Sequence, residues 1–429
     1  FGNRIIAESH FLQGDLAEAL PFAEQSRLYS EQSENLQDKI QCEVLLANIQ
    51  SGKAEHEAAL EHLLQAEQIA HIANDNRALA AIENHKGRFF FNTGQNHLAI
   101  ETFNGIIGTE WESINDDFNA EVLANLATCH IQIGKYEKAI SMCQHSLLHF
   151  QLSNNLNCQA FCIGTIGIAY LCQGIHHTAL EYLKKAVTLY RQIGRKGLIG
   201  ATLTNIASAY RGLGDYPTSI QYSSEALQLL TASGHRQRSA ITLGNIATVY
   251  RYLENFDQSK KYFLECLALF HQIDENDTAP MYRGNLGNLL YDQGLYDEAQ
   301  VYLEQAVDEF KRSELPIQEC QFTGYLCQIL IKNKEFAKAK QMAFHKYQVF
   351  CEHNRKDEIP GALITIGDLY ATPDFYEYSV DSAEQYYKQG LDAFIETDNK
   401  HGIWYVYQHT AQFYKQTKQW EKYAEFIEK

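Results

Sequence analysis

A period of forty residues constrains this chain more than any other feature. The stretch Asn205-Ile-Ala-Ser-Ala-Tyr-Arg211 returns as Asn245-Ile-Ala-Thr-Val-Tyr-Arg251, and again as Asn285-Leu-Gly-Asn-Leu-Leu-Tyr291. A fixed period of this length indicates a stack of similar units, each of which buries its apolar face against its neighbours. We therefore expect one extended stack in place of the two or three separate domains that 429 residues would normally suggest.

Two small residues recur in each of the first nine units, twelve positions apart, and in the tenth unit four extra residues in the turn separate them further. The second of them marks the start of a second helix, and it falls at Ala19, Ala59, Ala99, Ala139, Ala179, Ser219, Ser259, Ala299, Ala339 and Ala383. Small residues at both places allow two antiparallel helices to approach closely. Between them lies a turn that often carries glycine, the residue best suited to the left-handed conformation that ends a helix. The pattern predicts an all-α fold of helix-turn-helix units.

These residues resemble the tetratricopeptide repeat (TPR) family, although the units have forty residues where about 34 are usual. The resemblance implies a right-handed α-solenoid of about ten and a half repeats that covers residues 1–429 as one domain. The long units resemble those of LGN/Pins-type scaffolds and of bacterial TPR sensor regions. The expected units are 1–39, 40–79, 80–119, 120–159, 160–199, 200–239, 240–279, 280–319, 320–359, 360–403 and a partial unit at 404–429.

Composition excludes several classes of protein. A net charge of -17 argues against general nucleic-acid binding. No apolar run reaches the 18 residues of a membrane span. The ten cysteines form no CxxC pair and no disulfide framework, so we expect free thiols and a cytoplasmic location.

Polar residues recur along one face of the first helix in several units. In TPR proteins this face lines the concave groove, so the resemblance implies that these side chains point into it. An Asn amide both donates and accepts hydrogen bonds and can grip an extended peptide backbone, and an Arg can bind a carboxylate with two bonds. The alternative is that the Asn residues bond neighbouring repeats or face water. The predicted peptide-binding residues are Asn125, Asn205, Ser208, Arg211, Asn245, Thr248, Arg251, Asn285, Asn288 and Tyr291.

Positive charge is concentrated in one segment. Residues 184–261 contain eleven Lys and Arg but only four Asp and Glu. An acidic partner would be steered towards this segment and repelled by the rest of the chain. The sequence therefore predicts a partner that is acidic or that ends in a free carboxylate, although a solvated basic face is the simpler alternative.

No enzyme signature occurs: the sequence contains no GxxxxGK[ST], GxSxG or HExxH. We expect no catalytic residues, no cofactor and no metal site, and a function as a protein-interaction scaffold or adaptor. The alternative is that the repeats form the sensory or regulatory region of a larger signalling enzyme, such as a cyclase, kinase or protease, whose catalytic domain lies beyond Lys429. The incomplete last unit favours this alternative.

Overall fold

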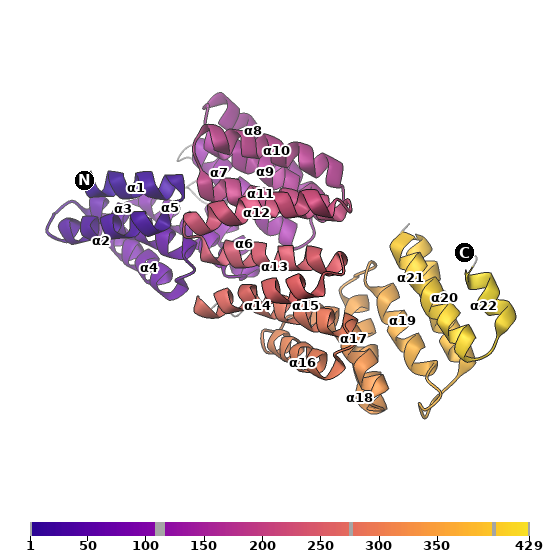
Figure 1. Cartoon of the computed structure of the whole chain (residues 1–429). Helices are drawn as coiled ribbons and strands as arrows, with labels where there is room; N and C mark the ends of the chain where they lie inside the picture. Colours follow the sequence, from indigo (N-terminus) through magenta and orange to yellow (C-terminus); the bar gives the residue numbers. More distant parts are fainter. Residues whose placement is uncertain (1, 108–115, 274–277, 397–399, 428–429) are drawn as a thin grey trace. The chain divides into compact units, whose positions relative to one another are not determined.

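The computed structural model of this protein describes residues 2–107, 116–273, 278–396 and 400–427, and these ranges are helical with short turns and contain no strand (Figure 1). The expected all-α fold is thus confirmed. The last two residues of the partial eleventh unit, 428–429, lie outside the described residues.

Contacts divide the chain into two compact units, Phe1–Asp277 and Thr278–Lys429. The first unit contains α1 (Gly2–Gln13), α2 (Leu16–Glu31), α3 (Leu36–Gly52), α4 (His56–Ala73), α5 (Asn76–Asn92), α6 (Asn96–Ile107), α7 (Asp116–Gln132), α8 (Tyr136–Leu152), α9 (Leu156–Cys172), α10 (His176–Gln192), α11 (Lys196–Gly212), α12 (Tyr216–Ala232), α13 (Arg236–Tyr252) and α14 (Phe256–Gln272).

The second unit contains α15 (Ala279–Asp292), α16 (Tyr296–Arg312), α17 (Pro316–Lys332), α18 (Phe336–Glu352), α19 (Ile359–Tyr370), α20 (Val380–Glu396), α21 (Lys400–Gln416) and α22 (Trp420–Ile427). Pro280, Pro316 and Pro360 lie in the first turns of α15, α17 and α19, where a missing backbone N–H costs nothing. The four extra residues of the tenth repeat lie in the turn between α19 and α20.

Each odd-numbered helix packs on the even-numbered helix that follows it, and the small residues lie where the two meet. Ala139 and Ala179 occupy equivalent places at the starts of α8 and α10, and both are buried. In α12 the small residue is Ser219, whose hydroxyl donates a hydrogen bond across the pair to the Ala207 carbonyl at 2.8 Å. A side chain this short reaches the opposite backbone only because the two helices are close. This close approach is what the recurring small residues predicted.

Neighbouring odd-numbered helices also contact one another, as α9 does with α11 and α11 with α13. The odd-numbered helices therefore form the more closely spaced, inner layer of the stack. Stacked tyrosines tie this layer to the even-numbered helices, as in Tyr210–Tyr222 and Tyr250–Tyr262, whose ring centroids lie 5.4 and 5.6 Å apart.

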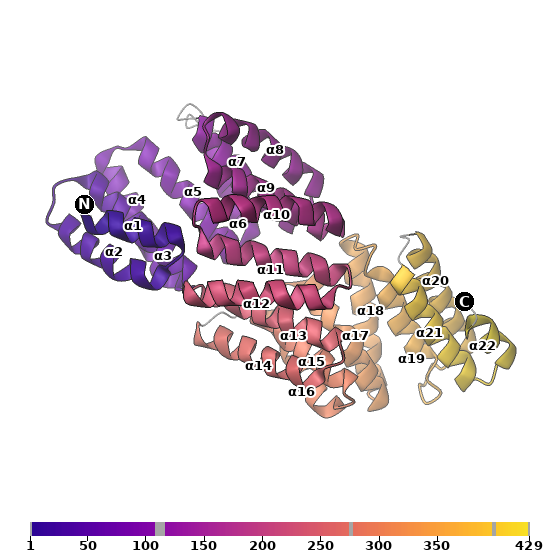
Figure 2. The same cartoon turned by 45° about the horizontal axis from the view of Figure 1, so that its top comes forward.

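The first repeat closes onto the sixth within the first unit. The backbone N–H of Leu16 donates to the Ser233 carbonyl at 3.2 Å, and the Arg195 guanidinium donates to the Leu12 carbonyl at 3.0 Å. Gly14 has φ +85°, and a Cβ there would lie 2.6 Å from the backbone N of Gly197, so only glycine fits. Both views show α1 and α2 beside the end of α12 (Figures 1 and 2). Contacts between residues about 180 to 220 positions apart thus close the stack around an interior.

Candidate functional site

The predicted groove residues of α11 lie along one face of that helix. Asn205, Ser208 and Arg211 are all half-buried. The Ser208 hydroxyl donates to the Thr204 carbonyl one turn earlier, at 3.1 Å. Among the described residues nothing bonds to the Asn205 amide, which is therefore able to donate to a ligand and to accept from it.

Helix α13 repeats this face forty residues later and contacts α11 directly. Asn245, Thr248 and Arg251 are half-buried, and the Thr248 hydroxyl donates to the Gly244 carbonyl at 2.9 Å. The structure thus brings two equivalent Asn, hydroxyl and Arg rows onto adjacent inner helices.

Asn125 behaves differently from the other members of the predicted set. It is buried, and its amide nitrogen donates to the side-chain oxygen of Asn84 at 3.0 Å. Asn84 in turn donates to Glu121 at 3.1 Å. At this position the Asn bonds the neighbouring repeat, which is the alternative that the sequence left open for the recurring Asn residues.

Asn285, Asn288 and Tyr291 lie on α15, in the second unit. The side-chain oxygen of Asn288 is buried and has no hydrogen-bond partner in the described part of the chain. The Tyr291 hydroxyl donates to Gln328 at 2.5 Å, and its ring packs against Tyr325 at 4.6 Å between centroids. Tyr291 therefore helps to hold α15 against α17.

Part of the positive charge in residues 184–261 stabilises the fold. Arg191 pairs with Glu225 at 2.7 Å, and Lys196 pairs with Asp15 at 3.3 Å across the closure of the first unit. Lys184 donates to the Tyr210 hydroxyl at 2.9 Å. Of these three cations only Lys196 is paired with a carboxylate from outside the segment.

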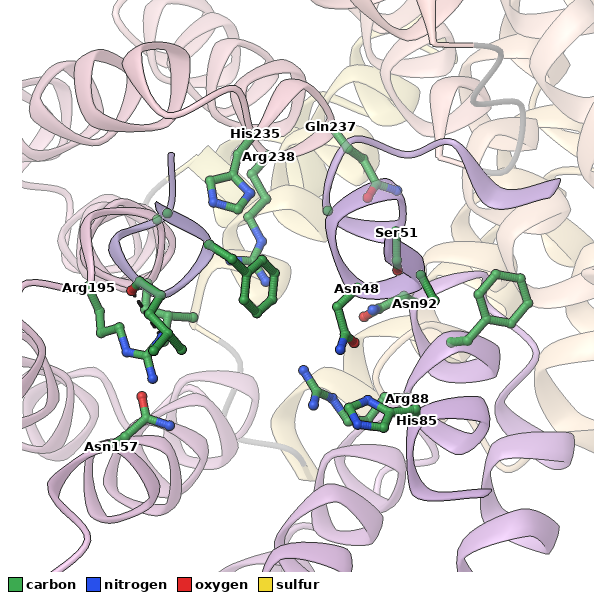
Figure 3. A pocket seen from close by; sticks show the side chains of 18 of the residues that line it. Asn48, Ser51, His85, Arg88, Asn92, Asn157, Arg195, His235, Gln237 and Arg238 are labelled. Atoms are coloured by element: carbon green, nitrogen blue, oxygen red, sulfur yellow. Dashed lines mark hydrogen bonds between the residues drawn. The ribbon is translucent and has the colours of Figure 1, made fainter. Parts of the chain in front are cut away.

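The interior of the first unit contains a cavity of ≈ 390 Å³, hereafter the inner cavity. Figure 3 shows the polar side chains that surround it: His235 and Arg238 at the top, Arg195 and Asn157 on one side, and Asn48, His85 and Arg88 on the other. Apolar walls complete the cavity, and they are formed by Phe11, Leu12, Leu63, Phe89 and Leu198.

The inner cavity carries positive charge and hydrogen-bond donors. Among the described residues that line it there are three Arg and no Asp or Glu. Burial lowers the pKa of His85 to about 3, with a further contribution from Arg88, and burial with the nearby Arg238 lowers the pKa of His235 to about 3. Burial also lowers the pKa of Arg238. Both imidazoles are therefore neutral at physiological pH, and the guanidiniums supply the charge.

Three cavity residues occupy the same repeat positions as predicted peptide-binding residues. His85 is equivalent to Asn205, and Asn48 and Arg88 are equivalent to Ser208. The forty-residue register, extended back into the second and third repeats, indicates all three positions, although His85 and Arg88 are not Asn. The repeat register does not indicate Arg195, His235 and Arg238, which lie at the starts of α11 and α13. These residues line the cavity because the first repeat closes onto this part of the chain.

Side chains that could react with a substrate or bind a metal ion are the next feature of the described residues. Burial raises the pKa of the Cys158 thiol to about 12, so this group stays protonated at neutral pH and is a poor nucleophile. No three His, Cys, Asp or Glu side chains in the described part of the chain come together as a metal site would require. None of the described helices is both long enough and apolar enough to cross a bilayer.

Comparison with known proteins supports the repeat assignment. Tetratricopeptide repeat models match residues 118–192 and 198–272, and a further one matches residues 281–312. No curated protein matches the sequence.

Several solved structures share the fold. A Rap protein complexed with Competence and Sporulation Factor is 15% identical, with a TM-score of 0.50 over 78% of this chain and 99% of that one. The apo form of the quorum sensor NprR from B. thuringiensis is 14% identical, with a TM-score of 0.57 over 81% and 96% of the two chains. Aspartyl phosphate phosphatase F from Bacillus subtilis is 13% identical, with a TM-score of 0.52 over 91% and 93%. Tetratricopeptide-repeat models thus match three stretches of the chain, and the chain shares its fold with a Rap protein and with NprR.

Proposed function

We propose that this protein is a non-catalytic interaction module whose inner face binds an extended segment of a protein partner. The repeat register carries the proposal. Positions equivalent to Asn205 and Ser208 line the inner cavity in the second and third repeats, where they are His85, Asn48 and Arg88. By this equivalence the face of α11 and α13 that carries the Asn and Arg rows faces the interior as well.

The chemistry of these rows favours an acidic segment or a free C-terminal carboxylate. The unbonded amide of Asn205 suits a peptide backbone regardless of its sequence. Arg211 and its repeat equivalent Arg251 lie two turns further along adjacent helices and would select the carboxylates. Asn285, Asn288 and Tyr291 occupy repeat positions on α15, in the second unit, that are equivalent to those of Asn205, Ser208 and Arg211. The amide nitrogen of Asn125 is bonded to Asn84 of the neighbouring repeat.

The neighbours of similar fold support binding of a signal. One of them was solved with the Competence and Sporulation Factor, and another is named a quorum sensor. A third is a Signal Transduction ATPase with Numerous Domains from Pyrococcus horikoshii that carries a TPR sensor, of which this chain matches 54% at 13% identity and a TM-score of 0.50. That match keeps the second candidate function open, in which these repeats are the sensory region of a larger signalling enzyme. A catalytic motif encoded beyond Lys429 would distinguish it from a scaffold.

Selection of binders from a displayed peptide library with residues 1–429 tests the proposal. We expect enrichment of acidic or carboxylate-terminated peptides, with an affinity that falls as salt rises because the screening length is only about 8 Å at physiological ionic strength. Arg211→Ala with Arg251→Ala should weaken binding and flatten this salt dependence. Asn245→Ala should weaken binding with little change in salt dependence, because the Asn carries no charge. Equal affinity of all variants would place the binding surface elsewhere.

A further inference from the structure

We infer that the inner cavity is a binding site for a small organic polyanion, a molecule that joins two or more phosphate or carboxylate groups to an apolar or ring portion. This site differs from the proposed peptide surface in place and in ligand. Asn205, Arg211, Asn245 and Arg251 are not among the described residues that line the cavity.

The first argument is charge. Arg88, Arg195 and Arg238 come from three different helices or their leading turns, and no carboxylate in the described lining compensates them. The charge of Arg88 contributes to the lowered pKa of Arg238, after the larger effect of burial, so these two like charges repel one another. Each guanidinium carries five N–H donors and can bind oxyanions with paired hydrogen bonds, although one donor of Arg195 is already bonded to the Leu12 carbonyl. A polyanion would neutralise this cluster.

The second argument is unsatisfied polar atoms. The Nδ1 atom of His85 and the side-chain oxygen of Asn157 are both buried and have no hydrogen-bond partner among the described residues. Buried polar groups are paired in the great majority of cases, so exceptions require an explanation. Both residues line the inner cavity, where a ligand that carries donors and acceptors would satisfy them.

The third argument is size and the apolar wall. A volume of ≈ 390 Å³ lies within the range of small-molecule sites, which hold roughly 300–1,000 Å³. Phe11 and Phe89 add flat apolar surfaces that a ring could contact. Lone inorganic ions would leave this surface wet, whereas a phosphorylated ring compound would cover it.

Binding would also strengthen the closure of the first unit. Arg88 belongs to α5, whereas Arg195 precedes α11 and also holds the Leu12 carbonyl. An anion held by both would bridge the early repeats and the sixth repeat in addition to the Leu16–Ser233 backbone bond. Ligands that bind only the closed arrangement raise its stability by mass action.

Calorimetric titration and thermal melting of residues 1–429 with ADP, pyrophosphate and citrate, at physiological ionic strength, test the inference. We expect saturable binding of ADP and a rise in Tm, with ADP bound more tightly than pyrophosphate because only ADP would cover the apolar wall. Arg238→Gln and Arg88→Gln should each weaken it about tenfold or more, since hydrogen bonds to charged groups are the strong ones. Arg236→Gln is the matched control for Arg238→Gln, because it also removes one positive charge from α13. Arg236 is exposed and does not line the inner cavity.

The variants carry a second signature that separates ligand binding from a structural role. Removing one guanidinium should raise the Tm of the empty protein, because it relieves repulsion, while it reduces the shift that ligand produces. Hydrogen exchange at the Leu16 amide should slow when ligand is added to the unaltered chain and not when it is added to Arg238→Gln. Absence of saturable binding by all three probes overturns the inference. The inference is also overturned if Arg238→Gln and Arg88→Gln bind as tightly as the unaltered chain. The same holds if Arg236→Gln weakens binding as much as these two variants do.

Discussion

Ala207→Leu should overpack the helix pair α11–α12. Ala207 is 1% exposed, and its carbonyl accepts the Ser219 hydroxyl at 2.8 Å from the opposite helix, so there is no space for three further carbon atoms. Overpacking of a core costs about 1–3 kcal/mol. In a unit of this size each kcal/mol lowers Tm by roughly 2–4 °C, so we expect a drop of about 2–12 °C.

The assay is thermal and urea unfolding of residues 1–429, with hydrogen exchange resolved along the chain. Because each repeat is stabilised by its neighbours, protection should fall in α10 and α13 as well as in α11 and α12. Ala232→Leu, on the exposed end of α12, is the control and should change the free energy of unfolding by no more than about 0.5 kcal/mol. An unchanged melt for Ala207→Leu would refute the claim that the forty-residue markers are close helix contacts.

Three further perturbations address the interior and the second unit. The pKa values of His85 and His235 in the folded chain, about 3, lie below the usual 6.5, so the unfolded chain takes up protons first and the free energy of unfolding falls as pH drops below 6.5. At pH 5.5 this loss is about 1.4 kcal/mol per ring. A double variant, His85→Gln with His235→Gln, should lack this loss when melting is followed as a function of pH. Leu16→Ala removes a fully buried side chain at the closure and should cost about 2–5 kcal/mol, with proteolysis of the first repeat before the rest; uniform proteolysis would contradict a local closure. In the second unit burial alone would lower the pKa of His409, but the charge of Asp368 and its 3.0 Å hydrogen bond to the imidazole outweigh burial and raise this pKa. Asp368→Asn should therefore move the titration of the His409 imidazole, followed by NMR, to lower pH. A titration that does not move would contradict the pairing.

The repeat register allowed most of the fold to be predicted. Small residues such as Ala139 and Ala179 must recur wherever two helices meet, so their spacing reports a local geometry that every unit repeats. The closure of the first unit could not be predicted in this way. It depends on single contacts such as Leu16–Ser233 between distant repeats, and contacts made once leave no periodic trace.

The candidate site was predictable to the extent that it follows the register. The face that carries Asn205 and Ser208 follows it, and so do His85 and Arg88 of the inner cavity, although they are not Asn. The use of Asn125 was not predictable, because its bond to Asn84 depends on which side chain the preceding helix offers forty-one residues earlier. A recurring residue type therefore indicates position more reliably than it indicates the bond that the residue makes.

The most direct measurement of the central claim is to locate a bound peptide on the chain. A selected acidic peptide that carries a photoreactive group would be crosslinked to residues 1–429, and the attachment points would be mapped by mass spectrometry. We predict attachment on the inner helices α11 and α13, near Asn205, Arg211, Asn245 and Arg251, with loss of crosslinks in the Arg211→Ala, Arg251→Ala variant. Attachment mainly to the even-numbered helices, such as α12 and α14, would contradict an inner binding face.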